Sequence, residues 1–455
     1  MRRLKTDSRK IKDGDIFLAL PGIRSNGHNY INNAISNGAG KIIALEGSYS
    51  VPYEIVPDTR EYMNEYFKNY YAPYIEDMTL IGITGTNGKT TTAFLIYEAL
   101  NKLGVKCAYI GTIGFYLDDK VFSLENTSPE ISEYYNMLLD AYEQGFRCAV
   151  LEVSSHGLAN GRLEGLSFDY AIFTNLTQDH LDFHKTMEGY ALAKQQLFHK
   201  LKVNGKAIVN FDDSYKSYFL LDHLDTVTYG FQGGDYQIIR YQMTNQDTAF
   251  WFCYDEKEYH VKSSLIGKYN IYNVIVTMIV LQMMKFHMSQ IVPLMLSLHT
   301  PVGRMEKVMH GTNCIIIDYA HTPDALINVI STVKEFSLHK IYVVFGCTGD
   351  RDRMKRPIMM DIATQECDYV IVTSDDLHDE DPDQIVQDML QGLVRDNYEV
   401  CMDRKKAIIR GIELLNQDDV LLILGKGHEE VMIVKNERIP FNDMNTVVTY
   451  LDQIK

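Results

Sequence analysis

The chain has 455 residues, and its 44 lysines and arginines against 60 aspartates and glutamates give a formal net charge of −16. At about 150 residues per domain, this length predicts roughly three domains. The acidic balance argues against a general nucleic-acid-binding protein, which would need a basic face to neutralise phosphates. It still permits an anionic small-molecule substrate, because a few lysines and arginines can reverse the charge locally.

Cysteine usage and apolar patterning predict the compartment. The seven cysteines are scattered without a CxxC pair, which predicts neither a disulfide framework nor a zinc site. No stretch approaches the ~20 apolar residues of a membrane span. Residues 1–15 have no apolar run after their basic residues, as a signal peptide would. We therefore expect a cytoplasmic monomer that binds neither nucleic acid nor membrane.

The first ~78 residues predict short strands and one or two helices. The apolar runs DIFLAL (15–20) and KIIAL (41–45) are typical of strands. The segment YINNAISNGAG (30–40) predicts a helix that ends at glycine. This part of the chain ends after a tyrosine-rich helical stretch.

The remaining chain predicts two successive α/β units. Residues 79–105 read as strand, glycine-rich turn and helix, and further strands alternate with helices. Those strands are CAVLEVSS (148–155), YAIFTNL (170–176) and KAIVNFD (206–212). Antiparallel hairpins are expected near 229–261. From about Pro301 a second, doubly wound unit is expected. Its strands are CIIIDYA (314–320), KIYVVFG (340–346), YVIVTSD (369–375) and VLLILGK (420–426).

The turn at 82–90 (GITGTNGKT) has the residues of a phosphate-binding loop. Gly85 and Gly88 allow the backbone to approach phosphate oxygens, and the following helix N-terminus offers free N–H groups. Lys89 would balance phosphate charge, and the Thr90 hydroxyl would bind Mg²⁺. The generic pattern fails at Ile83, where a small residue is usual. A tight glycine turn without a ligand is the alternative.

These blocks, in this order, resemble the Mur ligase family, and specifically the MurE type, which adds the third residue of the stem peptide. The resemblance covers nearly the whole chain, and its blocks include TDSR (6–9), GITGTNGKTTT (82–92), LEVSSHGLANGRL (151–163), FTNLTQDHLDFH (173–184), GKYNIYN (267–273), TPVGRME (300–306), IDYAHTPDAL (317–326), GDRDRMKRP (349–357) and LGKGHEE (424–430). It implies a three-domain α/β architecture with a central P-loop ATPase domain and a C-terminal Rossmann-like domain. The expected boundaries are 1–78 for UDP-muropeptide binding, 79–300 for ATP and 301–455 for the amino acid.

The resemblance also implies catalytic and metal-binding roles. Glu152 ends an apolar strand, where open α/β sheets place their ligands, and its carboxylate suits Mg²⁺. Taken alone, His180 is more often a hydrogen-bonded structural residue, and Lys194 an ordinary lysine with a buried stem. By resemblance, Glu152 and His180 hold a second Mg²⁺, Lys194 is carbamylated and joins the metal ligands, and Thr90 serves the nucleotide-bound ion. Lys89 completes the catalytic set.

The family pattern assigns two further groups of ligand-binding residues. The expected ATP-binding residues are Gly85, Thr86, Asn87, Gly88, Lys89, Thr90, Thr91, Asn270, Asn273, Arg304, Asp318 and His321. The expected UDP-muropeptide-binding residues are Ser8, Asn126, Thr127, Ser128, Ser154, Asn160 and Arg162. Ser128 and Asn160 depart from the Thr and Gln that relatives often carry. Taken alone, Ser8 could equally be a helix cap or a turn residue, and Asn270 and Asn273 are typical of helix caps.

The third domain is expected to select the amino acid. Arg351 resembles the arginine that pairs with the α-carboxylate, and Gly425 and Glu429 match positions near the amino end. Where relatives that use meso-diaminopimelate carry Asp-Asn-Pro-Arg, this chain has residues 375–378, Asp-Asp-Leu-His. Asp375, Asp376 and His378 are therefore assigned to the amino-acid site. Without that arginine, the two aspartates favour a free side-chain ammonium, which predicts L-lysine, with L-ornithine and meso-diaminopimelate as alternatives.

The activity implied is an ATP-dependent acid–amino-acid ligase that extends UDP-N-acetylmuramoyl-L-alanyl-D-glutamate through an acyl phosphate in peptidoglycan synthesis. Three other classes stay open at this point: a folylpolyglutamate synthetase, a non-catalytic nucleotide- or muropeptide-binding protein, and a simple P-loop kinase. The TDSR and SSHGL blocks argue against the first. The full set of Lys89, Thr90, Glu152, His180 and Lys194 argues against the second. The two α/β units exceed what the third needs.

Overall fold

The structure is a computed structural model that describes residues 2–22, 26–118, 120–124, 126–244, 246–337, 339–435 and 437–454. It contains two compact units: the first consists of residues 1–82, 100–171 and 196–205, and the second of residues 83–99, 172–195 and 206–455. Among the described residues, no helix combines the length and apolarity needed to cross a membrane.

The first unit begins with a small parallel sheet in the order β1-β2-β3-β4. Its elements are β1 (Leu4–Lys5), η1 (Ser8–Lys10), β2 (Ile16–Leu18), η2 (Gly27–Tyr30), α1 (Ile31–Ser36), β3 (Lys41–Ala44), β4 (Tyr53–Ile55), α2 (Thr59–Tyr70) and α3 (Ala72–Ile75). Phe17 and Ile42 pack with Ile31 and Ala34 of α1 in one core. The two predicted strands and the glycine-ended helix are thus confirmed.

The rest of the first unit carries four strands that are neighbours in one sheet, in the order β9-β6-β7-β8. Its elements are β6 (Cys107–Gly111), β7 (Gly114–Leu117), β8 (Lys120–Phe122), α5 (Ile131–Glu143), β9 (Cys148–Glu152), α6 (Ser155–Ala159) and η3 (Phe198–Lys200). Strands β6 and β9 are parallel, whereas β6, β7 and β8 form an antiparallel meander. Strands β5 (Thr79–Thr84) and β10 (Phe168–Phe173) begin in this unit and end in the second.

The second unit contains most of the helix that follows the glycine-rich turn, and it also contains three antiparallel strands. Its elements up to residue 300 are α4 (Lys89–Lys102), α7 (Leu181–His184), α8 (Met187–Gln195), β11 (Leu201–Asn210), η4 (Lys216–Tyr218), β12 (Asp225–Gly230), β13 (Tyr236–Met243), β14 (Thr248–Tyr254), β15 (Lys257–Ser263), α9 (Lys268–Met283), α10 (Met288–Leu294) and η5 (Met295–Ser297). Strands β13, β14 and β15 are antiparallel, as predicted. Most of α9 is buried.

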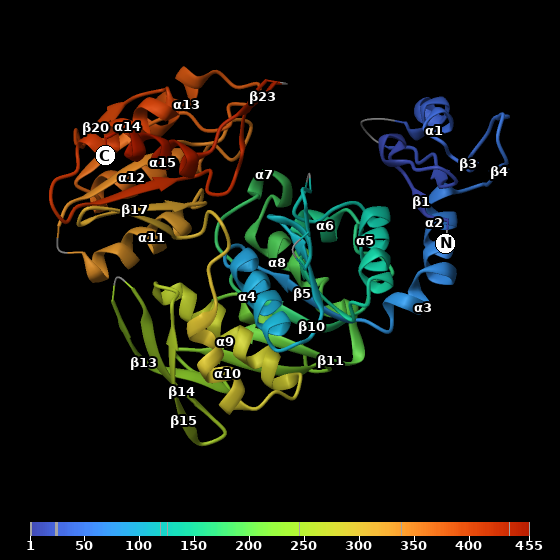
Figure 1. Cartoon of the computed structure of the whole chain (residues 1–455), viewed down its shortest axis with the longest axis horizontal. Coiled ribbons are helices and arrows are strands. Elements are labelled where there is room, and N and C mark those ends of the chain that lie inside the picture. Colours follow the sequence, from blue (N-terminus) through green and yellow to red (C-terminus); the bar gives the residue numbers. More distant parts are fainter. Residues whose placement is uncertain are drawn as a thin grey trace. The chain divides into compact units, whose positions relative to one another are not determined.

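The C-terminal part of the chain is drawn in orange and red in Figure 1. It contains a six-stranded sheet in the order β16-β17-β21-β18-β19-β20. Its elements are β16 (Glu306–His310), β17 (Asn313–Asp318), α11 (Pro323–Phe336), β18 (Ile341–Phe345), α12 (Lys355–Glu366), β19 (Tyr369–Val372), α13 (Pro382–Leu390), β20 (Tyr398–Val400), α14 (Arg404–Glu413), β21 (Val420–Leu424), β22 (Val431–Val434), β23 (Glu437–Pro440) and α15 (Asp443–Gln453). All pairs except β16–β17 are parallel.

Both faces of this C-terminal sheet are covered by helices, which is the predicted doubly wound arrangement. Alternate strand residues such as Val343 and Leu422 pack against α11, α12 and α13. Their neighbours Val344 and Leu421 pack against α14 and α15. Because successive side chains of a strand point to opposite faces, continuous apolar runs are what a sheet buried on both sides requires. The carboxyl ends of its parallel strands are therefore free to carry polar loops.

Candidate functional site

The glycine-rich turn lies between β5 and α4, as the sequence predicts. Gly85 has a φ of +152°, and a Cβ atom there would lie 1.9 Å from the Thr174 hydroxyl. The Asn87 N–H donates to the Asn175 side chain at 2.9 Å. The Thr174 hydroxyl donates to the Asn87 carbonyl at 2.7 Å. The segment after β10 thus holds the loop, and glycine is required where the two approach most closely.

Two lysines meet at this loop. Lys89 Nζ donates to the carbonyls of Gly85 and Thr86 at 2.9 and 2.8 Å. Lys194 on α8 is buried and donates to the same Gly85 carbonyl at 2.7 Å. Burial, followed by the charge of Lys89, holds the pKa of Lys194 well below its usual range. The loop therefore concentrates positive potential where phosphate groups would bind.

His180 begins α7 in a left-handed conformation, with a φ of +55°. Its Nε2 lies 3.3 Å from the Asp179 carboxylate. Burial acts to raise the pKa of Asp179, but the charges of His180, Lys355 and His321 outweigh it and lower that pKa. Asp179 also faces Lys194 electrostatically. The sequence analysis did not single out this buried carboxylate. It orients His180 and partly offsets the positive charges of Lys194 and Lys355.

Glu152 is the last residue of β9, as predicted, and is fully buried in the first unit. Its Oε1 accepts hydrogen bonds from the Tyr109 hydroxyl and from the Thr112 N–H, the latter at 2.9 Å. Its Oε2 accepts the Thr112 hydroxyl at 3.0 Å. These donors fix the orientation of the carboxylate. The other predicted metal ligands, Thr90, His180 and Lys194, belong to the second unit.

A cavity of about 310 Å³ adjoins the phosphate loop. It brings together seven predicted ATP-binding residues: Asn87, Gly88, Thr91, Asn270, Asn273, Arg304 and Asp318. It is also lined by residues that the sequence analysis missed: Asp212, Asp213, Tyr229, Tyr269, Tyr272, Asp324 and Asn328. Two of the missed residues are paired, since the Tyr272 hydroxyl donates to Asp212 at 2.6 Å. No motif marks the missed residues, which come from separate segments.

Asn270 and Asn273 lie inside α9 and do not cap it, because the N-cap is Gly267. Asn273 accepts a hydrogen bond from the Thr92 hydroxyl at 2.9 Å and donates to Asn270 at 2.9 Å. Asn270 in turn donates to the Ile266 carbonyl at 2.7 Å. The alternative of simple helix caps is therefore wrong, and the pair instead connects α9 to α4 at the cavity.

Arg304 and Asp318 line the same cavity. The Arg304 guanidinium lies 4.5 Å from the Tyr319 ring, and its Nη2 is 3.5 Å from the Thr90 hydroxyl. Asp318 accepts the Met305 and Ala320 N–H groups, each at 2.8 Å. Burial raises the pKa of Asp318 even though Arg304 opposes this. The aspartate thus fixes the turn from which Arg304 reaches toward the loop.

His321 is half-buried beside Tyr319 and does not line the cavity. Burial, then the charge of Lys355, lowers the pKa of His321 to about 4. Its Nδ1 is 2.8 Å from the Tyr319 carbonyl, which fixes the ring. A neutral imidazole can accept or donate a hydrogen bond without adding charge.

The predicted muropeptide residues gather in part within the first unit. Ser128 donates to the Glu152 carbonyl at 3.2 Å and accepts the Ser154 N–H at 2.9 Å. Arg162 donates to the Ser128 carbonyl at 2.8 Å and pairs with Glu130 at 2.8 Å. Arg162 Nε is buried without a hydrogen-bond partner among the described residues. Ser128, Ser154 and Arg162 therefore form one cluster beside the end of β9.

The other predicted muropeptide residues are more dispersed. Ser8 starts η1, but Asp7 provides its cap, so the helix-cap interpretation of Ser8 is wrong. Thr127 shares a 3.0 Å hydroxyl contact with Thr112. Asn126 and Asn160 are exposed.

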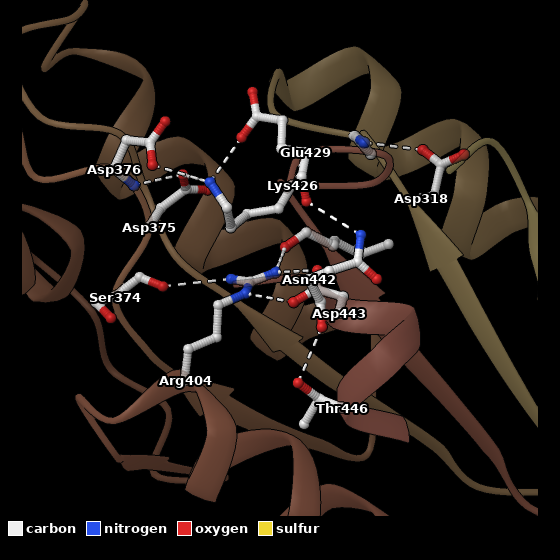
Figure 2. A network of polar contacts seen from close by, with 12 residues as sticks. Asp318, Ser374, Asp375, Asp376, Arg404, Lys426, Glu429, Asn442, Asp443 and Thr446 are labelled. Atoms are coloured by element: carbon white, nitrogen blue, oxygen red, sulfur yellow. Dashed lines mark hydrogen bonds and ion pairs between the residues drawn. The ribbon is translucent and has the colours of Figure 1, made fainter. Parts of the chain in front are cut away.

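The predicted amino-acid site is an ionic network at the carboxyl ends of β19 and β21 (Figure 2). Lys426 Nζ lies 2.6 Å from Glu429, 2.9 Å from Asp376 and 3.9 Å from Asp375. The protein's own ammonium thus already faces the carboxylates that favoured a free side-chain ammonium. The expectation of L-lysine loses its main electrostatic support, because the sequence argument left Lys426 out.

The other two residues predicted to bind the side chain or carboxylate of the amino acid, Arg351 and His378, differ in their surroundings. Arg351 is exposed in the loop between β18 and α12. The His378 N–H donates to the Ile433 carbonyl at 3.1 Å, and its φ is +50°. The backbone of His378 is therefore fixed against the segment of Ile433.

Three family models match consecutive parts of the chain: the Mur ligase family catalytic domain (1–77), the Mur ligase middle domain (83–281) and the Mur ligase glutamate ligase domain (303–427). A Clostridium acetobutylicum protein named UDP-N-acetylmuramoyl-L-alanyl-D-glutamate–2,6-diaminopimelate ligase 1 is 37% identical over 99% of this chain and 95% of its own length. A Fusobacterium nucleatum protein with the same enzyme name is 38% identical over 97% and 92%. The chain belongs to the Mur ligase family.

A solved structure of such a 2,6-diaminopimelate ligase is 33% identical, covers 100% of this chain and 95% of its own, and superimposes with a TM-score of 0.68. The three-domain α/β architecture of the family is thereby confirmed. The boundaries at residues 78 and 300 stay predictions, since the two compact units divide the chain elsewhere.

Proposed function

We propose that this chain is an ATP-dependent ligase that joins a diamino acid to the D-glutamyl carboxylate of UDP-N-acetylmuramoyl-L-alanyl-D-glutamate. The observation that carries the proposal is the cavity at the phosphate loop, lined by loop residues and by Asn270, Asn273 and Arg304. The full-length similarity to enzymes named for this reaction supports it. The cytoplasmic location and the monomeric state stay predictions.

The reaction proposed is amide synthesis in two steps. The substrate carboxylate attacks the γ-phosphorus of ATP, forming an acyl phosphate and releasing ADP. The incoming amine then attacks the acyl carbon and expels phosphate, with loss of a proton from nitrogen. Lys89 and Arg304 would offset charge on the transferring phosphoryl group. Ser128, Ser154 and Arg162 would bind the muropeptide, together with Ser8 and Thr127.

The residues suit the magnesium ions that the family implies. The Thr90 hydroxyl and the oriented Glu152 carboxylate offer oxygen ligands, which Mg²⁺ prefers, and the His180 imidazole would add a nitrogen ligand. The depressed pKa of Lys194 increases the neutral amine, which is the form that CO₂ carbamylates. The product is a carboxylate at the loop. When bound, the metal neutralises phosphate charge.

For the amino acid, meso-diaminopimelate is the first candidate. Lys426 already lies against Asp376 and Glu429, and the relatives are named for diaminopimelate. L-lysine is the second candidate, because His378 stands where diaminopimelate-using relatives carry arginine.

The test is phosphate release by the purified protein with ATP, Mg²⁺ and the UDP-muramoyl dipeptide, adding each amino acid separately. We expect release that depends on meso-diaminopimelate, with the tripeptide product found by mass spectrometry. Release only with L-lysine would keep the ligase and reverse the order of candidates. No amino-acid-dependent release would contradict the ligase.

A further inference from the structure

Lys426 is fully buried among three carboxylates. It comes from the turn after β21, whereas Asp375 and Asp376 follow β19 and Glu429 lies one turn further along the chain. Figure 2 shows its ammonium directed at the gap between the two aspartates and Glu429. A buried lysine is costly unless paired, and this one is paired three times.

The backbone conformation at Gly425 determines where the Lys426 ammonium lies. Gly425 has a φ of +112°, and a Cβ atom there would lie 2.6 Å from Asp375 Oδ2. The turn can therefore approach the aspartate only because residue 425 is glycine. This close approach brings the side chain of the next residue, Lys426, into the acidic cluster.

Surrounding contacts hold the carboxylates in position. Asp376 Oδ1 accepts the Ile433 N–H at 2.8 Å as well as the Lys426 ammonium. The Tyr319 hydroxyl donates to Glu429 Oε1 at 3.3 Å. Ile433 therefore holds Asp376 and Tyr319 holds Glu429, so the positions of these carboxylates do not depend on Lys426 alone.

A buried ion pair also supports the cluster. Arg404 pairs with Asp443 at 2.7 Å. Arg404 also donates to the Ser374 carbonyl at 3.3 Å and to the Leu424 carbonyl at 2.9 Å. Since Ser374 precedes Asp375 and Leu424 precedes Gly425, this one guanidinium joins the two loops that carry the cluster (Figure 2).

The charges show what Lys426 changes. The carboxylate oxygens of Asp375, Asp376 and Glu429 lie within 4.8 Å of one another, close enough to share a cation. Three carboxylates and one ammonium leave a formal charge of −2, whereas the carboxylates without the lysine would carry −3. The protein thus supplies internally the cation that this cluster would otherwise take from solution.

We propose that Lys426 determines specificity in the amino-acid site: its ammonium takes the place that the lone side-chain ammonium of lysine would take. It thereby favours an amino acid whose far end is zwitterionic, with both ammonium and carboxylate. This inference rests on the proposed ligase function, because it assigns a substrate preference to that site. Lys426 acts through Asp376 and Glu429 and is not itself a reacting group.

The test compares Lys426→Met with the native chain. Methionine keeps most of the length and removes the charge. The kcat/KM values for L-lysine and meso-diaminopimelate are measured by phosphate release, and we expect their ratio to shift toward lysine by on the order of tenfold. Lys406→Met is the matched control, since Lys406 is exposed on α14, where it pairs with Asp403 at the surface; it should leave the ratio unchanged.

A second variant distinguishes a change in specificity from a loss of activity through misfolding. Asp376→Asn keeps an oxygen acceptor for Lys426 and Ile433 but removes one negative charge, so the ratio should shift the other way. Parallel loss with both amino acids in both variants would mean that Lys426 is only structural and would overturn the proposal.

A binding measurement separates this inference from the ligase itself. Titration calorimetry with Mn²⁺, without nucleotide, should reveal one additional site in Lys426→Met compared with the native chain, because the −3 cluster then lacks its internal cation. A native chain without turnover would refute the ligase function. An active native chain whose Lys426→Met variant gains neither the Mn²⁺ site nor the altered ratio would refute the role of Lys426.

Discussion

Two buried lysines of this chain, Lys194 and Lys426, differ in what surrounds their ammonium groups. Both are at most 1% exposed. Lys194 donates to a backbone carbonyl and lies near the like charge of Lys89, so burial and that charge lower its pKa. Burial also acts to lower the pKa of Lys426, but Asp375, Glu429 and Asp376 outweigh it and raise that pKa.

The difference indicates two uses of a buried lysine. At the phosphate loop, positive charge is left poorly compensated, and an anion or a covalent change of the amine can relieve it. At the ends of β19 and β21, the charge is compensated inside the protein and is fixed there. The phosphate loop can therefore bind the negative charge of a ligand, whereas the charge of Lys426 is already compensated by carboxylates of the protein.

The largest expected effect lies in the uncompensated region. Lys89→Met removes the ammonium that would offset phosphoryl charge, and loss of such a group lowers turnover by about 10⁴-fold. The measurement is phosphate release at saturating substrates, with circular dichroism to establish folding. Lys68→Met, at an exposed position of α2, is the control and should retain full activity. A loss below tenfold for Lys89→Met would mean that the loop is not the phosphate site.

The compensated region should instead show its effect in stability. Arg404→Met leaves Asp443 as an unpaired buried carboxylate, and breaking a buried pair in this way costs about 3 kcal/mol. Replacing both residues, Arg404→Met with Asp443→Leu, should recover much of that loss. Urea unfolding measures the free energies. Equal destabilisation by the single and double variants would indicate that the contacts of Arg404 with Ser374 and Leu424 matter more than the ion pair.

The contrast between these two sites also explains which features of the structure could be predicted from the sequence. The phosphate loop is predictable because Gly85, Gly88 and Lys89 are close in sequence, and a local pattern states their geometry. The apolar runs of the C-terminal strands likewise predict a sheet buried on both faces. The β6-β7-β8 meander was missed because its short strands carry no clear alternation.

The amino-acid site was harder because its balance of charge depends on distant residues. Asp375 and Asp376 predict a free acidic pocket when taken alone. Lys426 lies 50 residues beyond Asp376 and reaches it because β19 and β21 are parallel strands of one sheet whose carboxyl ends lie at the same edge. The same holds for Asp212, Asp324 and Tyr272, which reach the nucleotide cavity from three segments without a shared motif.

A third prediction tests whether Lys194 is retained for function at a cost in stability. Lys194→Met should lower turnover about 100-fold while raising the melting temperature. Burial and the charge of Lys89 hold the pKa of Lys194 in the folded chain well below the usual lysine value of 10.5. Between the two pKa values the unfolded chain binds the additional proton, so stability rises with pH. The difference in melting temperature between variant and native chain should therefore widen as the pH falls below the usual lysine pKa of 10.5. A variant that is both inactive and less stable would contradict this.

The smallest expected effect concerns Asp324, which lines the nucleotide cavity at the start of α11. Its Oδ2 accepts hydrogen bonds from Asn87 of the phosphate loop at 2.7 Å and from Asn328 at 3.2 Å. Burial raises the pKa of Asp324, although both amides oppose this. The carboxylate thus tethers the loop but adds negative charge beside the expected triphosphate.

Two substitutions of Asp324 separate these contributions. Asp324→Asn keeps an acceptor for Asn87 and removes the charge, so the KM for ATP should fall about threefold. Asp324→Ala also removes the tether, and loss of about 1 kcal/mol of hydrogen bonding should raise that KM about fivefold above the Asn variant. Steady-state kinetics with varied ATP measures both. If the two variants shift the KM equally, the tether to Asn87 contributes nothing, and the cavity responds to Asp324 only as a charge.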